Sequence, residues 1–228
     1  MSPFRRVFRA ASRYARFYWR LPKAKRLRIR YFPPNYIFRD SLTPSSVVVD
    51  VGCGHEAELS VHLISTYGLR AFGVDPTRKH APALRTIEQR YAERFRYLAR
   101  AVAAKGGTLT FHESDVNESG SLLGDHTNVV HDTIRSYQVE AVTLRGLLEE
   151  IGCEHVDFLK LDLEGAEYEL LDTVAADALQ PFTQVFVEFH HHCIERFSVQ
   201  DTRRAAEDMR QKGFQSFTLD DHNYLFYR

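Results

Sequence analysis

Ionisable side chains stand near the ends of two apolar segments in the second half of the chain. In the run FLKLDLEG, Asp162 and Glu164 share one face of an expected strand, because successive strand side chains point to opposite faces. In the run QVFVEFHH, Glu188 and His190 share a face in the same way. A buried parallel strand is normally apolar, and ionisable groups are tolerated where they are paired or lie at its open end. These four residues are therefore candidate catalytic residues.

The four side chains would converge if the two strands are neighbours, since ligands of open parallel sheets bind beyond the carboxyl ends of the strands. His190 could then act as a general base towards a substrate hydroxyl, with Glu188 orienting the imidazole. The same group could instead hold a divalent metal ion that lowers the pKa of the hydroxyl. A third interpretation is a structural ion-pair network that Lys160 joins. His191 and His192 are expected at the rim, because neighbouring strand residues face opposite ways.

A second candidate site is the turn DVGCGHEA, which follows the first apolar strand and opens a helix. Gly52 and Gly54 allow the backbone to approach a ligand closely, and the amides at the helix start point towards it. Asp75 follows 21 residues after Gly54 and ends the next strand, where a carboxylate can accept hydrogen bonds from both hydroxyls of a ribose. Strand, glycine turn, helix, strand and terminal acid together predict a nucleoside-containing cofactor.

Two cofactors compete for this turn. The pattern Gly-x-Gly-x-x-Ala over residues 52–57 also matches the dinucleotide fingerprint, in which a pyrophosphate sits at the helix start. Asp50, Glu56 and Glu58 crowd that region with negative charge, which disfavours a pyrophosphate. S-adenosylmethionine carries a sulfonium cation and no phosphate, so an acidic turn tolerates it. We therefore expect S-adenosylmethionine rather than NAD.

Strand and helix patterns alternate from about residue 46. The periodicity predicts buried strands at 47–52, 70–75, 96–103, 156–165 and 184–191, and further extended segments at 108–114 and 137–144. Helices are expected at 56–67, 78–93, 144–151, 166–178 and from Ser198 to Gly213, before a terminal hairpin. Repeated βα units indicate the α/β class, with an open, mostly parallel sheet and helices on both faces.

Basic and acidic residues are segregated along the 228-residue chain, although 30 of each give a formal net charge of zero. Residues 1–40 contain 12 Lys or Arg and the single acid Asp40. Residues 41–228 contain 18 bases and 29 acids, a net of −11. We expect a basic N-terminal arm over residues 1–40 and one cofactor-binding domain over residues 41–228.

The arm has the pattern of a helix with two contrasting faces. At about 100° per residue, apolar side chains between Phe4 and Tyr18 fall on one face and arginines between Arg5 and Arg20 on the other. We predict a basic amphipathic helix, broken near Pro22 and ended before the pair Pro33-Pro34. Such a helix can contact a membrane surface, pack on the acidic domain or bind nucleic-acid phosphates. The net negative domain disfavours nucleic acid.

Other features bear on the compartment. No apolar run is long enough to cross a membrane, and no apolar core of a secretory signal stands near the start. Cys53, Cys153 and Cys193 lie far apart and form no disulfide framework. These features favour a cytoplasmic protein, with peripheral contact at the inner membrane face through residues 1–30.

Four stretches of the chain resemble the FkbM-type methyltransferase family: VVVDVGCG, AFGVDP, VTLRGLLEEIGCEHVDFLKLDLEGAEYELL and VFVEFHHH. The resemblance covers about residues 46 to 192, and its most specific part is the string from Asp157 to Glu167. It implies a class I, Rossmann-like fold with a reversed C-terminal strand, and S-adenosylmethionine as cofactor. It also implies methylation of a hydroxyl, often on a sugar or another natural-product scaffold.

The resemblance also implies roles for individual residues. Asp50, Gly52 and Gly54 would lie along the methionine end of the cofactor, and Asp75 would hold the ribose. Asp162 would face the transferred methyl group. The family usually reads Gly-Ala-Asn-x-Gly where this chain has Gly-Cys-Gly-His-Glu. Adenine would be held either by backbone groups or by the Ser114-Asp115 region. The expected cofactor contacts are therefore Asp50, Gly52, Cys53, Gly54, Asp75, Asp115 and Asp162.

The function that we expect is transfer of a methyl group from S-adenosylmethionine to the hydroxyl of a small molecule or glycan. No Asn/Asp-Pro-Pro-aromatic motif follows the fourth strand, which disfavours methylation of a nucleobase amino group. Two other classes stay open. One is a catalytically silent binding module docked by the basic helix, and the other is an RNA methyltransferase.

Overall fold

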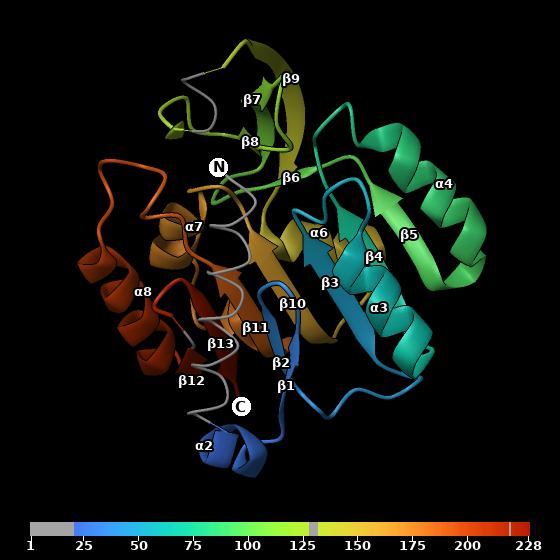
Figure 1. Ribbon diagram of the computed structural model, residues 1–228, viewed down its shortest axis with the longest axis vertical. Helices are drawn as coiled ribbons and strands as arrows, with labels where there is room; N and C mark the ends of the chain where they lie inside the picture. The colour runs from blue at the N-terminus through green and yellow to red at the C-terminus, as the bar shows by residue number, and fades with distance from the viewer. Residues whose placement is uncertain (1–20, 128–131, 219) are drawn as a thin grey trace, which may run out of the picture.

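The computed structural model describes residues 21–127, 132–218 and 220–228 (Figure 1). The basic amphipathic helix expected between Phe4 and Tyr18 lies outside these residues. The strands are β1 (Ile29–Phe32), β2 (Tyr36–Arg39), β3 (Val47–Val51), β4 (Arg70–Val74), β5 (Phe95–Leu98), β6 (Ala101–Val102), β7 (Gly107–Ser114), β8 (Gly120–Ser121), β9 (Ile134–Val142), β10 (Val156–Asp162), β11 (Phe182–Glu188), β12 (Gln215–Thr218) and β13 (Asn223–Tyr227). The helices are α2 (Leu21–Arg26), α3 (Glu58–Tyr67), α4 (Ala81–Tyr91), α6 (Leu144–Ile151), α7 (Glu167–Thr173) and α8 (Val199–Gln211), with 3₁₀ turns η1 (Ala92–Arg94) and η2 (Asp177–Leu179).

Seven strands form the central sheet in the order β12-β13-β11-β10-β3-β4-β5. The strands from β11 to β5 pair in parallel, whereas β13 runs antiparallel to both β11 and β12. β10 and β11 are neighbours, and their register places Asp162 opposite Glu188. The reversed last strand and the α/β class expected from the sequence are confirmed. The change of strand order at β3 and β10 creates the crevice in which such sheets bind ligands.

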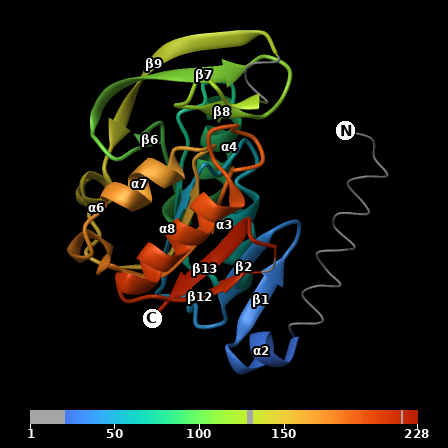
Figure 2. The same ribbon diagram turned by 90° about the vertical axis from the view of Figure 1, so that its left-hand side faces the viewer.

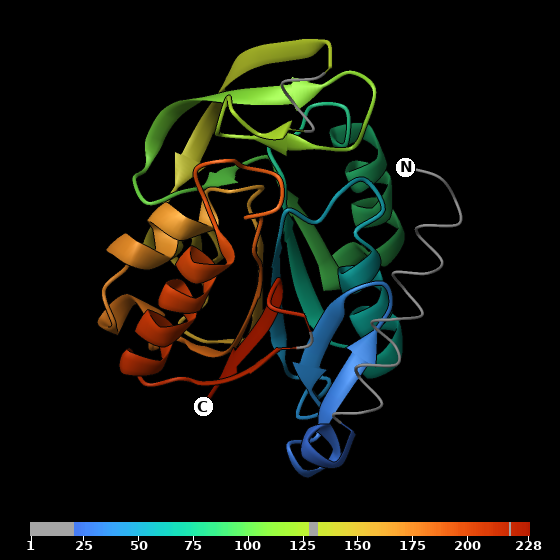
Figure 3. The same ribbon diagram turned by 60° about the vertical axis from the view of Figure 1, so that its left-hand side comes forward.

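Helices cover both faces of this sheet, as Figure 3 shows with the sheet between two groups of helices. On one face, α6, α7 and α8 bury Leu147, Leu171 and Met209 against Val49 and Leu161 of the sheet. Each fully buried side chain of this kind stabilises the fold by about 1.5–3 kcal/mol relative to an exposed one. The valine run of β3 is buried on both faces, which explains its uninterrupted apolar sequence.

The opposite face is covered by α3, α4 and the β1–β2 hairpin. Leu63 of α3 and Leu84 of α4 are fully buried there, together with Phe38 of the hairpin and Phe158 of the sheet. The rings of Phe38 and Phe158 lie 5.9 Å apart. Residues before position 41 therefore contribute to the core of the domain.

Helix ends follow the capping residues in the sequence. The Thr143 hydroxyl accepts a hydrogen bond from the amide of Gly146 at the start of α6, and Gly152 adopts φ 66° after its end. Ser198 and Asp201 form a capping box that begins α8. The predicted helix boundaries at Gly152 and Ser198 are confirmed.

Residues 101–142 build a second sheet of four strands, in the order β6-β9-β7-β8 (Figure 1). The two predicted extended segments pair with each other antiparallel along the whole of β7. The single strand predicted over residues 96–103 is wrong. The central strand ends at Leu98, and Ala101 pairs with Ala141 of the second sheet instead. The chain bends between them, where the amide of Arg100 donates to the carbonyl of Leu98 at 3.0 Å.

The hairpin of β1 and β2 packs beside β11 and β13, as Figure 2 shows. The amide of Arg39 donates to Oε1 of Gln184 at 2.6 Å, which fixes the hairpin to β11. The prediction of helix up to the proline pair is wrong from Ile29 onward. Ile29 and Ile37 are buried in the core, so tertiary pairing overrides the helical periodicity of this segment. Within the described ranges, no helix has both the length and the apolar character needed to span a membrane.

Candidate cofactor and catalytic site

A cavity of about 310 Å³ lies at the carboxyl ends of β3, β4 and β10. Six residues that the sequence predicts at the cofactor or catalytic site line it: Gly52, Cys53, Gly54, Asp75, Asp162 and Glu164. The second sheet supplies another wall through Phe111, Glu118 and Gly120. The cavity therefore lies between the central sheet and the second sheet, at the place where open parallel sheets bind ligands.

The glycine turn is held against the neighbouring strands. Gly52 adopts φ +71°, and a Cβ there would come within 2.1 Å of the carbonyl oxygen of Asp162. Gly54 adopts φ +67°, and its amide donates to Oδ2 of Asp75 at 2.9 Å. Gly52 is thus required by close packing, whereas Gly54 is favoured by its backbone conformation.

A buried lysine of β10 contacts both the glycine turn and Asp162. Lys160 is 1% exposed, and its Nζ donates to the carbonyl oxygen of Gly52 at 2.5 Å. The same Nζ lies 3.4 Å from Oδ1 of Asp50 and 3.2 Å from Oδ2 of Asp162. Burial alone would lower the pKa of Lys160, but Asp162, Tyr36 and Asp50 raise it well above its ordinary value. Lys160 is therefore a permanent cation behind the cavity.

Asp50 lies behind the turn rather than in the cavity lining. Its side chain is buried, and Oδ2 accepts a hydrogen bond from the Ser60 hydroxyl at 2.8 Å. The expected contact of Asp50 with the methionine end of the cofactor stays a prediction. A central strand cannot leave a carboxylate unpaired in the core, and Lys160 supplies the partner. The geometry gives Asp50 a structural role.

Asp75 lines the cavity, and its carboxylate is already engaged by the protein. Oδ1 accepts from the amide of Thr77 at 2.8 Å, while Nδ1 of His80 lies 3.2 Å from Oδ2. Burial would raise the pKa of Asp75, but hydrogen bonds and charge from His80, with help from Thr77, lower it. Asp75 is thus an oriented carboxylate. With Gly54 and His80 on Oδ2, the remaining capacity to accept from a ribose hydroxyl lies mainly on Oδ1.

Asp162, Glu164 and His190 come together as expected. Nε2 of His190 lies 3.5 Å from Oδ1 of Asp162 and 3.5 Å from Oε2 of Glu164. Nε2 of His126, a residue that sequence reasoning missed, lies 2.7 Å from Oε2 of Glu164. Glu164 also adopts φ 49°, a conformation that is costly for a residue with a side chain and that concentrates at functional sites.

The environments of the two carboxylates push their pKa values apart. Burial, Glu188 and Glu164 raise the pKa of Asp162 to about 7, against the opposing effect of Lys160 and His190. Burial would raise the pKa of Glu164, but His190 and His126 lower it to about 2. At neutral pH, Glu164 is a fixed anion and Asp162 exchanges a proton. Carboxyl groups with separated pKa values are a mark of acid–base sites.

His190 does not fit the role of general base. Its ring lies behind the cavity lining, and its backbone amide donates to Oε1 of Glu167 at 2.8 Å. Burial would lower the pKa of His190, but Glu164, Glu167 and Asp162 raise it well above 6.5. An imidazolium cannot accept a proton from a substrate. Glu167, fully buried and 3.3 Å from Nδ1, orients the ring in place of the expected Glu188.

Glu188 faces the hairpin rather than His190. Both of its carboxylate oxygens accept from Nδ2 of Asn35 at 3.2 Å. Tyr36, next to Asn35, lines the cavity. Nζ of Lys160 lies over its ring, 5.5 Å from the ring centre, in a cation–π contact. No local pattern in the sequence identifies Asn35 or Tyr36 as site residues, because they reach the site only through the packing of the hairpin.

Asp115 lies outside the cavity lining, and its expected cofactor contact stays a prediction. It forms an ion pair with Arg135, with 2.7 Å between Nε and Oδ1. The β7–β8 turn that follows brings Glu118 to the cavity instead. His191 and His192 lie beyond the end of β11, and Nδ1 of His191 is 2.8 Å from the Thr202 hydroxyl.

A profile described as "Methyltransferase FkbM domain" matches residues 43–216. The chain belongs to this family. The match spans the glycine turn, Asp75 and the cluster around Asp162, and the cofactor of this FkbM domain is S-adenosylmethionine. The fit is chemical as well, because the acidic cavity suits a cationic methyl donor.

The fibrillarin/Nop5p complex shows the same fold at low sequence identity, and two further solved structures align with lower scores. The fibrillarin/Nop5p complex aligns with a TM-score of 0.50 and 13% identity, covering 84% of this chain and 76% of that chain. Fibrillarin pre-rRNA processing protein of Methanococcus jannaschii gives 0.48 and 11%, covering 91% and 74%. A human methyltransferase 10 domain containing protein gives 0.47 and 12%, covering 94% and 80%. No curated protein matches the chain.

Proposed function

We propose that this FkbM-family methyltransferase methylates a hydroxyl group of a small molecule or glycan, with Asp162 as the general base. The observation that carries the proposal is the position of Asp162. It lines the cavity at the end of β10, beside the glycine turn, and its pKa is raised to about 7 by burial, Glu188 and Glu164. A base is most effective when its pKa lies near the working pH.

S-adenosylmethionine, when bound, supplies a methyl group that an acceptor oxygen takes by in-line displacement from the sulfonium. The chain positions the acceptor and removes its proton. Asp162 takes the hydroxyl proton on a carboxylate oxygen, and Lys160 at 3.2 Å stabilises the carboxylate that is ready to receive it. His190, charged and held by Glu167, fixes the orientation of Asp162 from the other side. Positioning supplies much of the rate, because the methyl donor is already activated.

A divalent metal ion is the alternative aid to deprotonation. Asp162, Glu164 and His190 offer ligand atoms that lie within 4.8 Å of one another. Nδ1 of His190 is already engaged by Glu167, and a metal ion at Nε2 would have to displace the proton that faces Asp162 and Glu164. We therefore base the proposal on proton transfer to Asp162 and keep the metal ion as the alternative.

The acceptor class is proposed from the charge of the cavity. Asp75, Glu118, Glu164 and Asp162 line it, and such a wall repels the phosphates of RNA but accepts hydrogen bonds from the hydroxyls of a neutral sugar. We propose a cytoplasmic location, with the basic arm as a contact to the membrane surface.

The test measures donor binding and methyl transfer separately. Calorimetry with S-adenosylmethionine and with NAD shows which cofactor binds. Turnover of methyl-labelled S-adenosylmethionine is then followed with a panel of free sugars, glycosides and phenols, and with total RNA. Donor binding with label in a hydroxyl acceptor supports the proposal. Donor binding without transfer to any of these supports the silent binding module, and transfer to RNA supports the RNA methyltransferase.

A further inference from the structure

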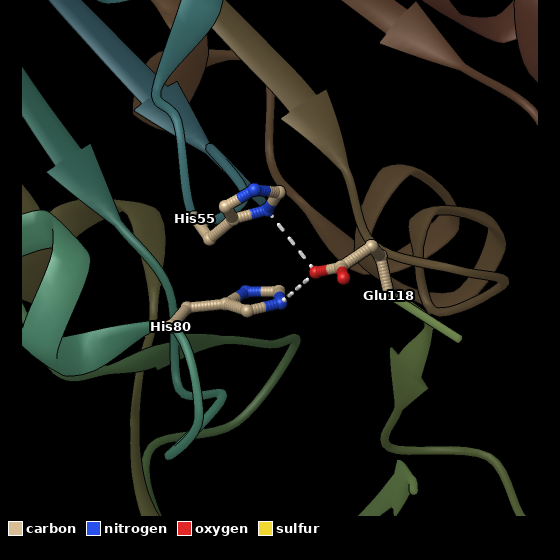
Figure 4. Close-up of side chains that lie close together, drawn as sticks. All are labelled: His55, His80 and Glu118. Atoms are coloured by element: carbon tan, nitrogen blue, oxygen red, sulfur yellow. Dashed lines mark hydrogen bonds and ion pairs between the residues drawn. The ribbon is translucent and has the colours of Figure 1, made fainter. Parts of the chain in front are cut away.

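Three side chains from separate elements face one another at one wall of the cavity (Figure 4). His55 follows the glycine turn, His80 precedes α4, and Glu118 lies on the turn between β7 and β8. Oε2 of Glu118 lies 3.1 Å from Nδ1 of His55 and 2.8 Å from Nε2 of His80. The two imidazole rings are 5.8 Å apart. One carboxylate oxygen thus bridges two imidazoles.

The second nitrogen of each imidazole faces another carboxylate. Nδ1 of His80 lies 3.2 Å from Oδ2 of Asp75, and Nε2 of His55 lies 3.6 Å from Oε1 of Glu56. Histidines that bind metal ions almost always have such a partner on the nitrogen that does not coordinate. The partner fixes the ring orientation, and a bound metal ion would take the place of the proton through which the other nitrogen contacts Glu118, releasing that proton to solvent.

The group combines fixed and adjustable parts. His80 is 3% exposed and Asp75 is held by the amides of Gly54 and Thr77, so this half is preorganised. The side chains of His55 and Glu118 are 45% and 68% exposed. Glu118 can therefore withdraw from direct contact with the imidazoles and let an ion take the position between the three groups.

We propose that His55, His80 and Glu118 bind a divalent transition-metal ion of the zinc class, with Asp75 orienting the imidazole of His80. Two histidines and one carboxylate are the protein ligands of zinc sites that keep a fourth position open. Imidazole ligands favour zinc, nickel or iron over magnesium and calcium, which prefer oxygen. The ligand atoms already lie within 4.8 Å of one another. This site is separate from the cluster around Asp162.

The ion would join the second sheet to the central sheet. Glu118 lies on the turn that joins β7 and β8 of the second sheet, whereas His55 and His80 follow β3 and β4 of the central sheet. A bound ion stabilises the folded state by mass action, because unfolding separates its ligands. Metal binding therefore predicts a higher melting temperature, in addition to the binding itself.

The experiment titrates Zn²⁺ into the metal-stripped full-length chain in competition with a chromophoric chelator, and repeats the titration with Co²⁺ to record the ligand-field spectrum. We expect one ion per chain, bound at least tenfold more weakly by His55→Asn and by Glu118→Gln. Both side chains are exposed, so both variants keep the fold, which circular dichroism verifies. His155→Asn is the matched control, since His155 is an exposed histidine beside Asp157.

A second control separates the two candidate clusters. Asp162→Asn removes a carboxylate from the cluster of Asp162, Glu164 and His190 and leaves the proposed site intact. It is expected to bind Zn²⁺ like the unmodified chain. The proposal is overturned if the chain binds no Zn²⁺, if His55→Asn and Glu118→Gln bind it unchanged, or if Asp162→Asn alone abolishes binding. In each of those cases the bridge at Glu118 is a hydrogen-bonded network only.

Discussion

Nζ of Lys160 lies 3.2 Å from Oδ2 of Asp162, and both residues stand on the same face of β10. Lys160 is buried in the core of the sheet, and Asp162 lines the cavity. Lys160 is also the partner of Asp50 and of the Gly52 carbonyl, so the glycine turn and the candidate base share one cation. The stability of the domain and the chemistry of the site are therefore linked through Lys160.

Replacing Asp162 tests its role as the base. Asp162→Asn keeps the size of the side chain but cannot accept a proton, so we expect kcat to fall by about 10²–10⁴. The dissociation constant of S-adenosylmethionine should change much less than kcat. Steady-state kinetics and calorimetry measure the two quantities. Asp177→Asn, on the exposed pair with Arg145, is the control. Unchanged kcat in Asp162→Asn would remove Asp162 from the mechanism.

The pH profile follows from the same residue. A base acts only when deprotonated, and the pKa of Asp162 is about 7 owing to burial, Glu188 and Glu164. The rate should therefore be low in acid, rise with pH through about 7 and level off above it. Measuring kcat/KM across this range gives the apparent pKa. A rate that is already at its plateau near pH 5 is incompatible with the proposed base.

Lys160 is the most sensitive residue for stability. In Lys160→Met, Asp50 and Asp162 lose their shared cation in the interior, and removing one partner of a buried ion pair costs about 3–5 kcal/mol. Chemical denaturation should show this loss of unfolding free energy. The control is Lys105→Met, because Lys105 is exposed on the bend before β7. Equal stability of the two variants would show that Lys160 is not needed to hold the carboxylates.

The two glycines of the turn should differ. A Cβ at Gly52 would lie 2.1 Å from the Asp162 carbonyl oxygen, whereas at Gly54 it would meet no atom within 4 Å. Gly52→Ala should therefore displace β10 and abolish cofactor binding. Gly54→Ala should lower the free energy of unfolding by about 1 kcal/mol, because alanine is strained at this positive φ. Thermal unfolding and calorimetry compare them. If both variants bind S-adenosylmethionine normally, the turn is not the cofactor site.

Membrane binding by the basic arm can be tested separately. Removing residues 1–20 leaves α2 and the hairpin, whose buried Ala24 and Ile29 belong to the core. Full-length protein should float with vesicles that contain anionic lipid, and the shortened chain should float less, because arginines are lost from the interface. Vesicles of neutral lipid are the control. Equal flotation of both chains would show that the arm does not provide the contact.

Local sequence patterns predicted much of the fold and part of the site. The valine run of β3, the glycine turn and the alternation around Asp162 depend on neighbours in the chain, and their interpretation needs no tertiary information. His126 and Tyr36 act at the site through contacts with distant elements, so no local pattern identifies them. Glu167 ends the string that most resembles the family, but its contact with His190 becomes visible only in the fold. The charge of His190 is likewise not predictable from the local sequence. It depends on Glu167, whose position is set by the end of β10 and the start of α7.

The most direct test of the account is transfer of an isotopically labelled methyl group from S-adenosylmethionine to the panel of sugars, glycosides and phenols, with the product carbon identified by NMR. The account predicts label on oxygen, with transfer lost in Asp162→Asn and retained in Asp177→Asn. Label on nitrogen or carbon, or transfer that Asp162→Asn carries out at the normal rate, would contradict it.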